Sequence, residues 1–118
     1  MYICNEMAMS KKDLFEKQEA ELSMFCKALG HPARVKIVKL LLIKNNQTCN
    51  ELVQNIPLSQ STVSQHLGEL RQAKIISGKS VSTSVIYSVD KIALSKAQKM
   101  LSDFFNANIL SAKQATLF

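Results

Sequence analysis

The chain has 118 residues, of which 47% are apolar, and its formal net charge is +6. This length supports one domain with a single core, and the basic charge fits a nucleic-acid partner, an anionic membrane or an acidic protein. No apolar run could span a bilayer and no secretory signal is visible, so we expect a cytoplasmic protein without a membrane segment.

The N-terminal part predicts a helix over residues 11–29, after a flexible start at 1–10. Apolar side chains recur in it at helical spacing, and charged side chains take the other side. A second helix begins near Pro32, since proline is tolerated in the first turn of a helix. It is apolar enough to be the central core helix, and a polar turn over residues 44–47 follows it. Its core candidates are Val35, Ile37, Val38, Leu41 and Leu42.

Residues 49–73 predict a helix, a tight turn and a second helix. Leu52, Val53 and Ile56 share one face of the first helix, and Pro57 ends it because the residue before a proline disfavours helical geometry. Ser59 is the expected N-cap of the second helix, since its hydroxyl can accept a hydrogen bond from the first turn.

The second helix, residues 59–73, has a narrow apolar stripe made of Val63, Leu67 and Leu70. Its outer face carries hydroxyls and amides in place of the charges of an ordinary solvated helix. Such side chains can recognise the donor and acceptor pattern of base edges in the DNA major groove. We therefore predict a helix-turn-helix with 59–73 as its recognition helix.

Ten residues are candidate DNA contacts. Gln60, Ser61 and Gln65 are placed for base edges, whereas Ser59 and Thr62 are placed for phosphate. The cations are expected to contact the backbone, although Arg34 could instead form a structural ion pair and His66 could lie at the boundary of the core. The full set is Ser59, Gln60, Ser61, Thr62, Ser64, Gln65, His66, Arg71, Lys79 and Arg34.

After the recognition helix, residues 75–89 predict two strands of a β-hairpin, since they are rich in β-branched side chains. Gly78 and the serine-rich run 80–84 supply an expected flexible middle. Val85, Tyr87 and Val89 alternate and should share one face. Lys79 is the only cation near the tip.

From Asp90 onward the pattern predicts a terminal helix with an apolar band broader than docking on its own core requires. With the helix at 11–29, this band is suited to a homodimer interface, and docking on its own core is the alternative. Residues 111–118 are expected to be a flexible tail. The interface candidates are Leu14, Phe15, Leu22, Phe25, Leu101, Phe104 and Phe105.

Three segments carry a family resemblance: residues 28–37, which include His31-Pro32-Ala33-Arg34, residues 58–67, and residues 70–76 followed by Tyr87. Over roughly residues 25–90 the chain resembles the ArsR/SmtB family of bacterial winged-helix repressors. The resemblance implies a mainly α fold with a small β-hairpin, a single winged helix-turn-helix domain over 1–118, and a homodimer formed by the first and last helices. It also implies repression of transcription through binding of double-stranded DNA.

The sequence offers no set of residues for catalysis, so we expect no enzyme and no cofactor. The family's Cys-x-Cys metal site aligns with Thr48 and Asn50, which flank Cys49. Its terminal-helix site aligns with Ile92, Asp103 and Asn106. Both standard metal sites are therefore expected to be absent, because zinc prefers nitrogen and sulfur donors.

Two alternatives stay open. Thiolates of Cys4, Cys26 and Cys49 could form a metalloid or redox sensor. The sparse cations on the recognition helix and wing would also fit a winged-helix protein-interaction module that does not bind DNA. The sequence names no inducer.

Overall fold

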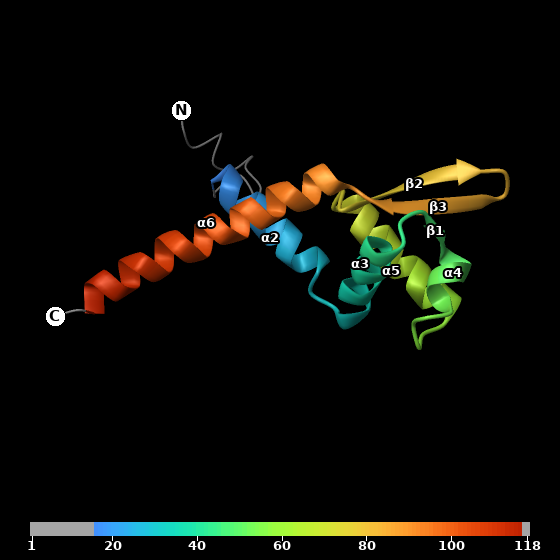
Figure 1. The fold of residues 1–118 in the computed structure, drawn as a ribbon, viewed down its shortest axis with the longest axis horizontal. Helices are drawn as coiled ribbons and strands as arrows, with labels where there is room; N and C mark the ends of the chain where they lie inside the picture. The colour runs from blue at the N-terminus through green and yellow to red at the C-terminus, as the bar shows by residue number, and fades with distance from the viewer. Residues whose placement is uncertain (1–15, 117–118) are drawn as a thin grey trace, which may run out of the picture.

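The computed structural model describes residues 16–116, with side chains over 16–107. Its helices are α2 (Lys17–Ala28), α3 (Pro32–Ile43), α4 (Cys49–Val53), α5 (Gln60–Gln72) and α6 (Lys91–Thr116). Its strands are β1 (Gln47–Thr48), β2 (Ile76–Val81) and β3 (Ser84–Val89). Helices α2 and α6 lie on one side of the molecule, and the hairpin of β2 and β3 projects from the other (Figure 1).

Helix α2 is shorter than the predicted helix over 11–29. Glu16 is its N-cap, and the Glu16 backbone N–H donates to the Glu19 carboxylate at 3.2 Å. This contact fixes the first turn, so the helix begins at Lys17. The expected flexible start at 1–10 and the residues Cys4, Leu14 and Phe15 lie outside the described part of the chain.

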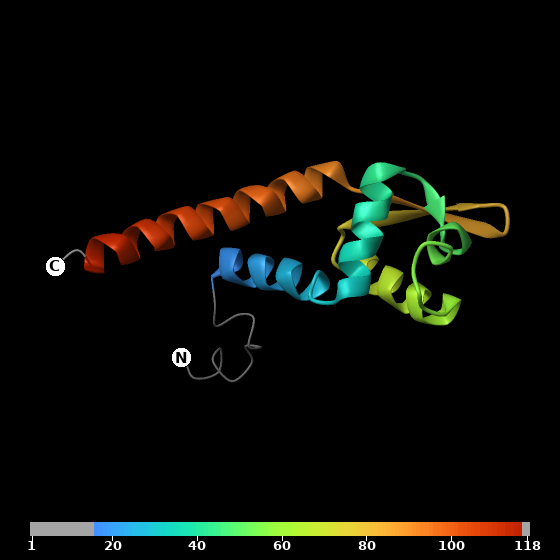
Figure 2. The same ribbon diagram turned by 60° about the horizontal axis from the view of Figure 1, so that its bottom comes forward.

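Helix α3 is the central core helix, as predicted, but only one of its faces is buried. Ile37 and Leu41 are 0% exposed. Val35 and Leu42, which we also expected in the core, are 43% and 58% exposed. The correction follows from helical geometry, because these two residues lie seven positions apart on a different face of α3 from buried Ile37 and Leu41. In Figure 2 this helix crosses between α2 and α4.

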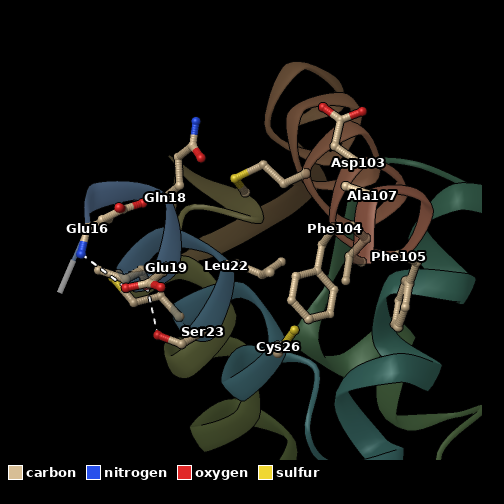
Figure 3. Close-up of a pocket in the computed structure, with 14 residues that line it drawn as sticks. Glu16, Gln18, Glu19, Leu22, Ser23, Cys26, Asp103, Phe104, Phe105 and Ala107 are labelled. Atoms are coloured by element: carbon tan, nitrogen blue, oxygen red, sulfur yellow. Dashed lines mark hydrogen bonds between the residues drawn. The ribbon is translucent and has the colours of Figure 1, made fainter. Parts of the chain in front are cut away.

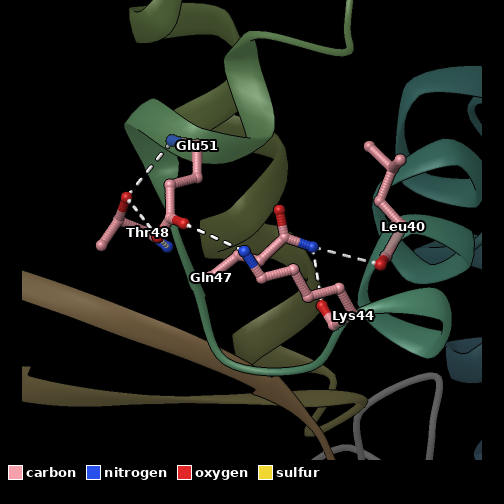
Figure 4. Close-up of polar contacts among 5 residues, drawn as sticks. All are labelled: Leu40, Lys44, Gln47, Thr48 and Glu51. Carbon is pink, nitrogen blue, oxygen red and sulfur yellow. Dashed lines mark hydrogen bonds and ion pairs between the residues drawn. The ribbon is translucent and has the colours of Figure 1, made fainter.

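The polar turn expected after α3 ends in a short strand. Gln47 is buried, and its Nε2 donates to the carbonyl oxygens of Leu40 at 3.1 Å and Lys44 at 2.7 Å (Figure 4). These bonds satisfy carbonyls at the end of α3. Gln47 and Thr48 form β1, which pairs antiparallel with β3 in a sheet of order β1-β3-β2.

The wing is more regular than predicted. Val81 pairs with Ser84, so the turn consists only of Ser82 and Thr83, and the flexible middle expected over 80–84 is wrong. Ser82 has a positive φ of 57°, as a tight hairpin turn requires. The expected shared face of Val85, Tyr87 and Val89 is confirmed, because Tyr87 and Val89 are buried and Val85 is half-buried.

Helix α6 continues to Thr116 and so includes residues 111–116, where the sequence predicted a flexible tail, and residues 117–118 are not described. Its first half packs on α2: Ala97 is 1% exposed, and Lys96 Nζ lies 3.1 Å from Glu21 Oε2. The second half extends away from the core. The Cα radius of gyration is accordingly 18.4 Å, whereas a compact domain of this length has about 13–14 Å.

The core lies where α3, α4, α5 and the inner face of the sheet meet. Its fully buried side chains are Ile37, Leu41, Leu52, Leu67, Leu70, Ile75 and Val63. The predicted class, mainly α with a small β-hairpin arranged as a winged helix-turn-helix, is confirmed by this architecture.

Candidate nucleic-acid interface

A capping box formed by Thr48 and Glu51 stabilises the N-terminus of α4, the first helix of the helix-turn-helix. Thr48 Oγ1 accepts from the Glu51 backbone N–H at 3.2 Å, and a Glu51 carboxylate oxygen accepts from the Thr48 N–H at 3.0 Å. The Thr48 amide is the main cause that lowers the pKa of Glu51. The helix then ends at Val53, before Pro57, so proline does not stop it as we expected. Leu52 and Ile56 still anchor the turn, since both are buried.

Ser59 is the N-cap of α5, as predicted, and its hydroxyl accepts from the Thr62 backbone N–H at 3.3 Å. The same hydroxyl lies 2.9 Å from Thr62 Oγ1 and 3.2 Å from Ser61 Oγ. Three hydroxyls thus gather at the positive end of the helix dipole, and the first turn has no acidic side chain. This arrangement suits an anion such as a phosphate.

The two faces of α5 differ sharply in burial. Val63, Leu67 and Leu70 are 0% exposed, so the predicted apolar stripe is docked in the core. The opposite face is solvent-exposed and uncharged over its first two turns. It presents Gln60, Ser61, Ser64, Gln65 and Gly68, and Thr62 is half-buried at its edge. The open surface of α5 therefore carries side chains that can recognise the edges of DNA bases.

Gly68 lies on this open face. A Cβ built at Gly68 would meet no heavy atom within 4 Å, so no neighbouring side chain explains the glycine. We predict that Gly68 permits close approach of a DNA backbone, and a tolerated local defect is the alternative. Glycine inside a helix costs about 1 kcal/mol relative to alanine.

Two candidate contacts are placed elsewhere. His66 is 9% exposed, and its Nδ1 accepts from Arg34 Nε at 3.1 Å. Arg34 Nη1 also donates to the carbonyl oxygens of Lys27 and Ala28 at 3.3 and 3.4 Å. Both side chains are thus engaged at the junction of α2, α3 and α5, which favours a structural role for each, and their contact with DNA stays an untested prediction. Arg34 pairs with a ring nitrogen and carbonyls, which differs from the ion pair considered as its alternative.

Arg71 connects the recognition helix with the wing, and Lys79 lies on the wing itself. Arg71 is exposed near the end of α5, and its guanidinium lies 5.9 Å from the centroid of the Tyr87 ring. Lys79 is exposed on β2, where it pairs in register with Ile86. The contact between Arg71 and Tyr87 was not predicted from the sequence, which indicated only that Tyr87 shares a face with Val85 and Val89. The signal that could have found it is an arginine at the helix end followed by an aromatic in the second strand.

The described residues give the thiol hypothesis little support. They contain no group of three His, Cys, Asp or Glu side chains that could hold a metal ion. Burial raises the pKa of Cys49, whose thiol lies 3.8 Å from the Gln60 carbonyl oxygen, so its reactive thiolate is disfavoured. Cys26 is exposed on α2, where it lines the apolar groove between α2 and α6. At the aligned family sites, Asp103 pairs with Lys99 at 3.1 Å, and Asn106 donates to Ser102 at 3.4 Å.

Comparison with known proteins agrees with this geometry. A family model described as bacterial regulatory protein, arsR family, matches residues 31–77, a range that contains α3, α4 and α5. An uncharacterised HTH-type transcriptional regulator of Mycobacterium tuberculosis is 35% identical over 97 residues, which are 79% of this chain and 81% of that protein. The biofilm growth-associated repressor of Xylella fastidiosa is 29% identical over 91% of this chain and 90% of the repressor.

Solved structures share the fold. An ArsR-like transcriptional regulator from Rhodococcus sp. RHA1 superposes with a TM-score of 0.68 at 22% identity, and the match covers 83% of this chain and 94% of that chain. At this identity the likeness concerns the architecture alone. Separately, no helix in the described range 16–116 has the length and apolar character needed to cross a membrane.

Proposed function

This chain belongs to the arsR family of bacterial regulatory proteins, and we propose that it represses transcription as a homodimer bound to double-stranded DNA. It is a transcriptional regulator and not an enzyme, as the sequence predicted, because its family and its relatives are regulators. Two copies of α5 would enter successive major grooves, about 34 Å apart along an imperfect palindrome. Such a regulator acts on the chromosome, and therefore in the cytoplasm.

One observation carries the proposal: the polar face of α5 is open to solvent while its apolar face is completely buried. Gln60, Ser61 and Gln65 are the proposed base contacts, since amides and hydroxyls can donate and accept. Ser59, Thr62 and Ser64 would contact phosphate or sugar, and the hydroxyl cluster at the helix start supports this role. Arg71 and Lys79 would add backbone charge.

A groove between α2 and α6 supports the homodimer. Its volume is about 1100 Å³, and its apolar lining includes Leu22, Met24, Met100, Leu101 and Phe105. Figure 3 shows Leu22 and Cys26 of α2 pointing toward Phe104 of α6.

Of the proposed interface residues, Phe104 and Phe105 remain 46% and 51% exposed within one protomer, while Leu22, Phe25 and Leu101 are half-buried. A second copy of this chain is the occupant we propose, because large exposed apolar surfaces mark interaction sites. Docking of the α6 band on its own core, the alternative from the sequence, would leave less of this surface exposed.

DNA binding is tested by gel shift of the full-length protein with random-sequence duplexes at low salt. We expect a retained complex for the wild type. Ser61→Glu should abolish it, because the variant places a carboxylate on the open face of α5 without touching the core. A glutamate in the first turn also favours the helix, so the fold should survive.

The matched control is Ser95→Glu, which adds the same charge to an exposed position of α6 and should bind like the wild type. If the wild type retains no duplex, the repressor proposal is wrong, and the protein-interaction module becomes the better interpretation. Capture of genomic fragments by the wild type would then identify the operator, whose neighbouring genes would indicate the signal.

A further inference from the structure

Three side chains meet where α2, α3 and α5 join, and neither the core nor the proposed DNA contacts account for them. His31 is the N-cap of α3, and its Nδ1 accepts from the Ala33 N–H at 3.0 Å. The His31 and His66 rings lie 4.3 Å apart between centroids, with an interplanar angle of 43°. Arg34 donates to His66 from the other side, at 3.1 Å. We call His31, Arg34 and His66 the junction cluster.

Arg34 links two helices with different proposed tasks. One end of its guanidinium bonds to carbonyls in the last turn of α2, where the helix dipole favours a positive charge. The Nε bonds to His66 of α5. Helix α2 belongs to the proposed dimer interface and α5 is the proposed recognition helix, so this side chain joins the two surfaces.

The link depends on the protonation state of His66. Nδ1 of His66 accepts a hydrogen bond, so it carries no proton in this arrangement. A proton there would place two donors and two positive charges against each other at 3.1 Å. The groups that act on His66 are His31 and Arg34 from α3, the carbonyl end of α2 through Arg34, and Glu69 on α5 itself. Burial, followed by His31 and Arg34, lowers the pKa of His66, and Glu69 opposes this only weakly.

We propose that Arg34 is a positioning residue that holds α5 against the end of α2 through neutral His66, and that protonation of His66 releases α5 and weakens binding of specific DNA. This inference rests on the proposed function, because α5 must be the DNA-contacting helix. It goes beyond that function by assigning a pH-sensitive connection between the dimer surface and the DNA surface.

The direction of the effect is diagnostic. A protein that gains positive charge on acidification ordinarily binds DNA more tightly, through the phosphates. The junction cluster predicts the opposite for specific sites. From about pH 7.5 to about pH 5.5, binding of the preferred duplex should weaken roughly two- to fourfold, because a histidine whose pKa lies below its ordinary value of about 6.5 is only partly protonated at the lower pH.

The experiment uses full-length protein and the duplex it enriches most from a random pool at about pH 7.5. Dissociation constants are measured at both pH values and constant ionic strength for the wild type and three variants. His66→Asn keeps an acceptor near the Nδ1 position but does not titrate, so its binding should not weaken on acidification. His31→Asn keeps the N-cap and should respond like the wild type. Arg34→Met should bind more weakly at the higher pH and lose the response.

A second readout needs no DNA. The Arg34 Nε–H resonance in proton–nitrogen spectra should be protected from exchange at about pH 7.5 and lost as His66 titrates. In His66→Asn the resonance should persist at the lower pH. The backbone amide signals in the same spectra also show whether each variant is folded.

The outcomes separate this inference from the proposed function. A wild type that binds the duplex equally well at both pH values, or a response that disappears in His31→Asn but survives in His66→Asn, overturns the positioning role alone. If no duplex is enriched, the DNA-binding proposal fails and this inference fails with it. If the Arg34 Nε–H resonance persists while His66 titrates, the positioning role of Arg34 is overturned, irrespective of the DNA-binding results.

Discussion

The guanidinium of Arg71 lies 5.9 Å from the centroid of the Tyr87 ring, and this contact joins the end of α5 to the wing. Gly78 pairs with Tyr87 in the hairpin register. A Cβ at Gly78 would lie 2.9 Å from Arg71 Cζ and 3.0 Å from Val85 Cγ1. The glycine therefore leaves space for the guanidinium to lie against the strand.

Gly78→Ala should disturb this contact with little cost to the fold. The added methyl group displaces Arg71, whose side chain is flexible, and DNA binding should fall roughly two- to fivefold, matching about 0.5–1 kcal/mol for an exposed cation–π contact. The thermal midpoint should change little. Ser80→Ala, on the same strand, is the control and should bind normally. Equal binding by both variants would show that the Arg71–Tyr87 contact has no role in DNA binding.

Gln65→Ala should reduce discrimination between DNA sites. A glutamine that contacts a base in bidentate fashion contributes about 1–3 kcal/mol of selectivity. Competition between the preferred duplex and single-base variants measures this directly. Gln98→Ala removes an exposed amide from α6 and should keep full discrimination. If Gln65→Ala weakens every sequence equally, the assignment of that face to base recognition is wrong.

Lys79→Ala should weaken binding to all duplexes alike, because we propose that this wing lysine contacts phosphates. The slope of log affinity against log salt should flatten by about one unit. Titrations at several salt concentrations supply the measurement. Lys99→Ala is a suitable comparison, since that ammonium is paired with Asp103 on α6 and should leave the slope unchanged. If the salt slope of Lys79→Ala equals that of the wild type, the wing lysine does not contact DNA phosphates.

Phe105→Glu should dissociate the proposed homodimer. The side chain is 51% exposed in one protomer and lines the groove between α2 and α6. Loss of its burial should cost about 1.5–3 kcal/mol per copy, and sedimentation over a dilution series would show the monomer. Ile43→Glu changes a side chain that is 81% exposed on α3 and lies outside the groove. A dimer weakened equally by both variants would contradict this placement of the interface.

Stability should decrease on acidification because of His66. Its pKa is lowered in the folded state, mainly by burial, so the folded protein binds fewer protons than the unfolded chain in this range. The free energy of unfolding is therefore highest above the ordinary histidine pKa of about 6.5 and falls as the pH drops below it. Urea titrations at several pH values give the free energies of unfolding of the wild type and of His66→Asn. The difference between these two free energies isolates the contribution of His66. If the difference in unfolding free energy does not change with pH, His66 does not contribute to the pH dependence of stability.

The sequence by itself determined the order of the main helices and of the two hairpin strands, the N-cap Ser59 and the buried stripe of Val63, Leu67 and Leu70. These features follow from local chemistry: the spacing of apolar residues, the capping hydroxyl and the change to β-branched side chains after α5. The open polar face of α5 was predictable for the same reason, because a residue's position on a helix fixes its direction.

Tertiary structure decided what residues far apart in the sequence do together. Arg34 and His66 had the residue types of DNA contacts, yet 32 positions separate them and the fold pairs them inside the junction cluster. Gln47 became the first residue of a strand because the α3 carbonyls and β3 supply its partners. Val35 and Leu42 are exposed because no element within the described residues 16–116 covers that side of α3. Spacing along the chain specifies which face of a helix a side chain occupies, but only packing specifies what lies opposite that face.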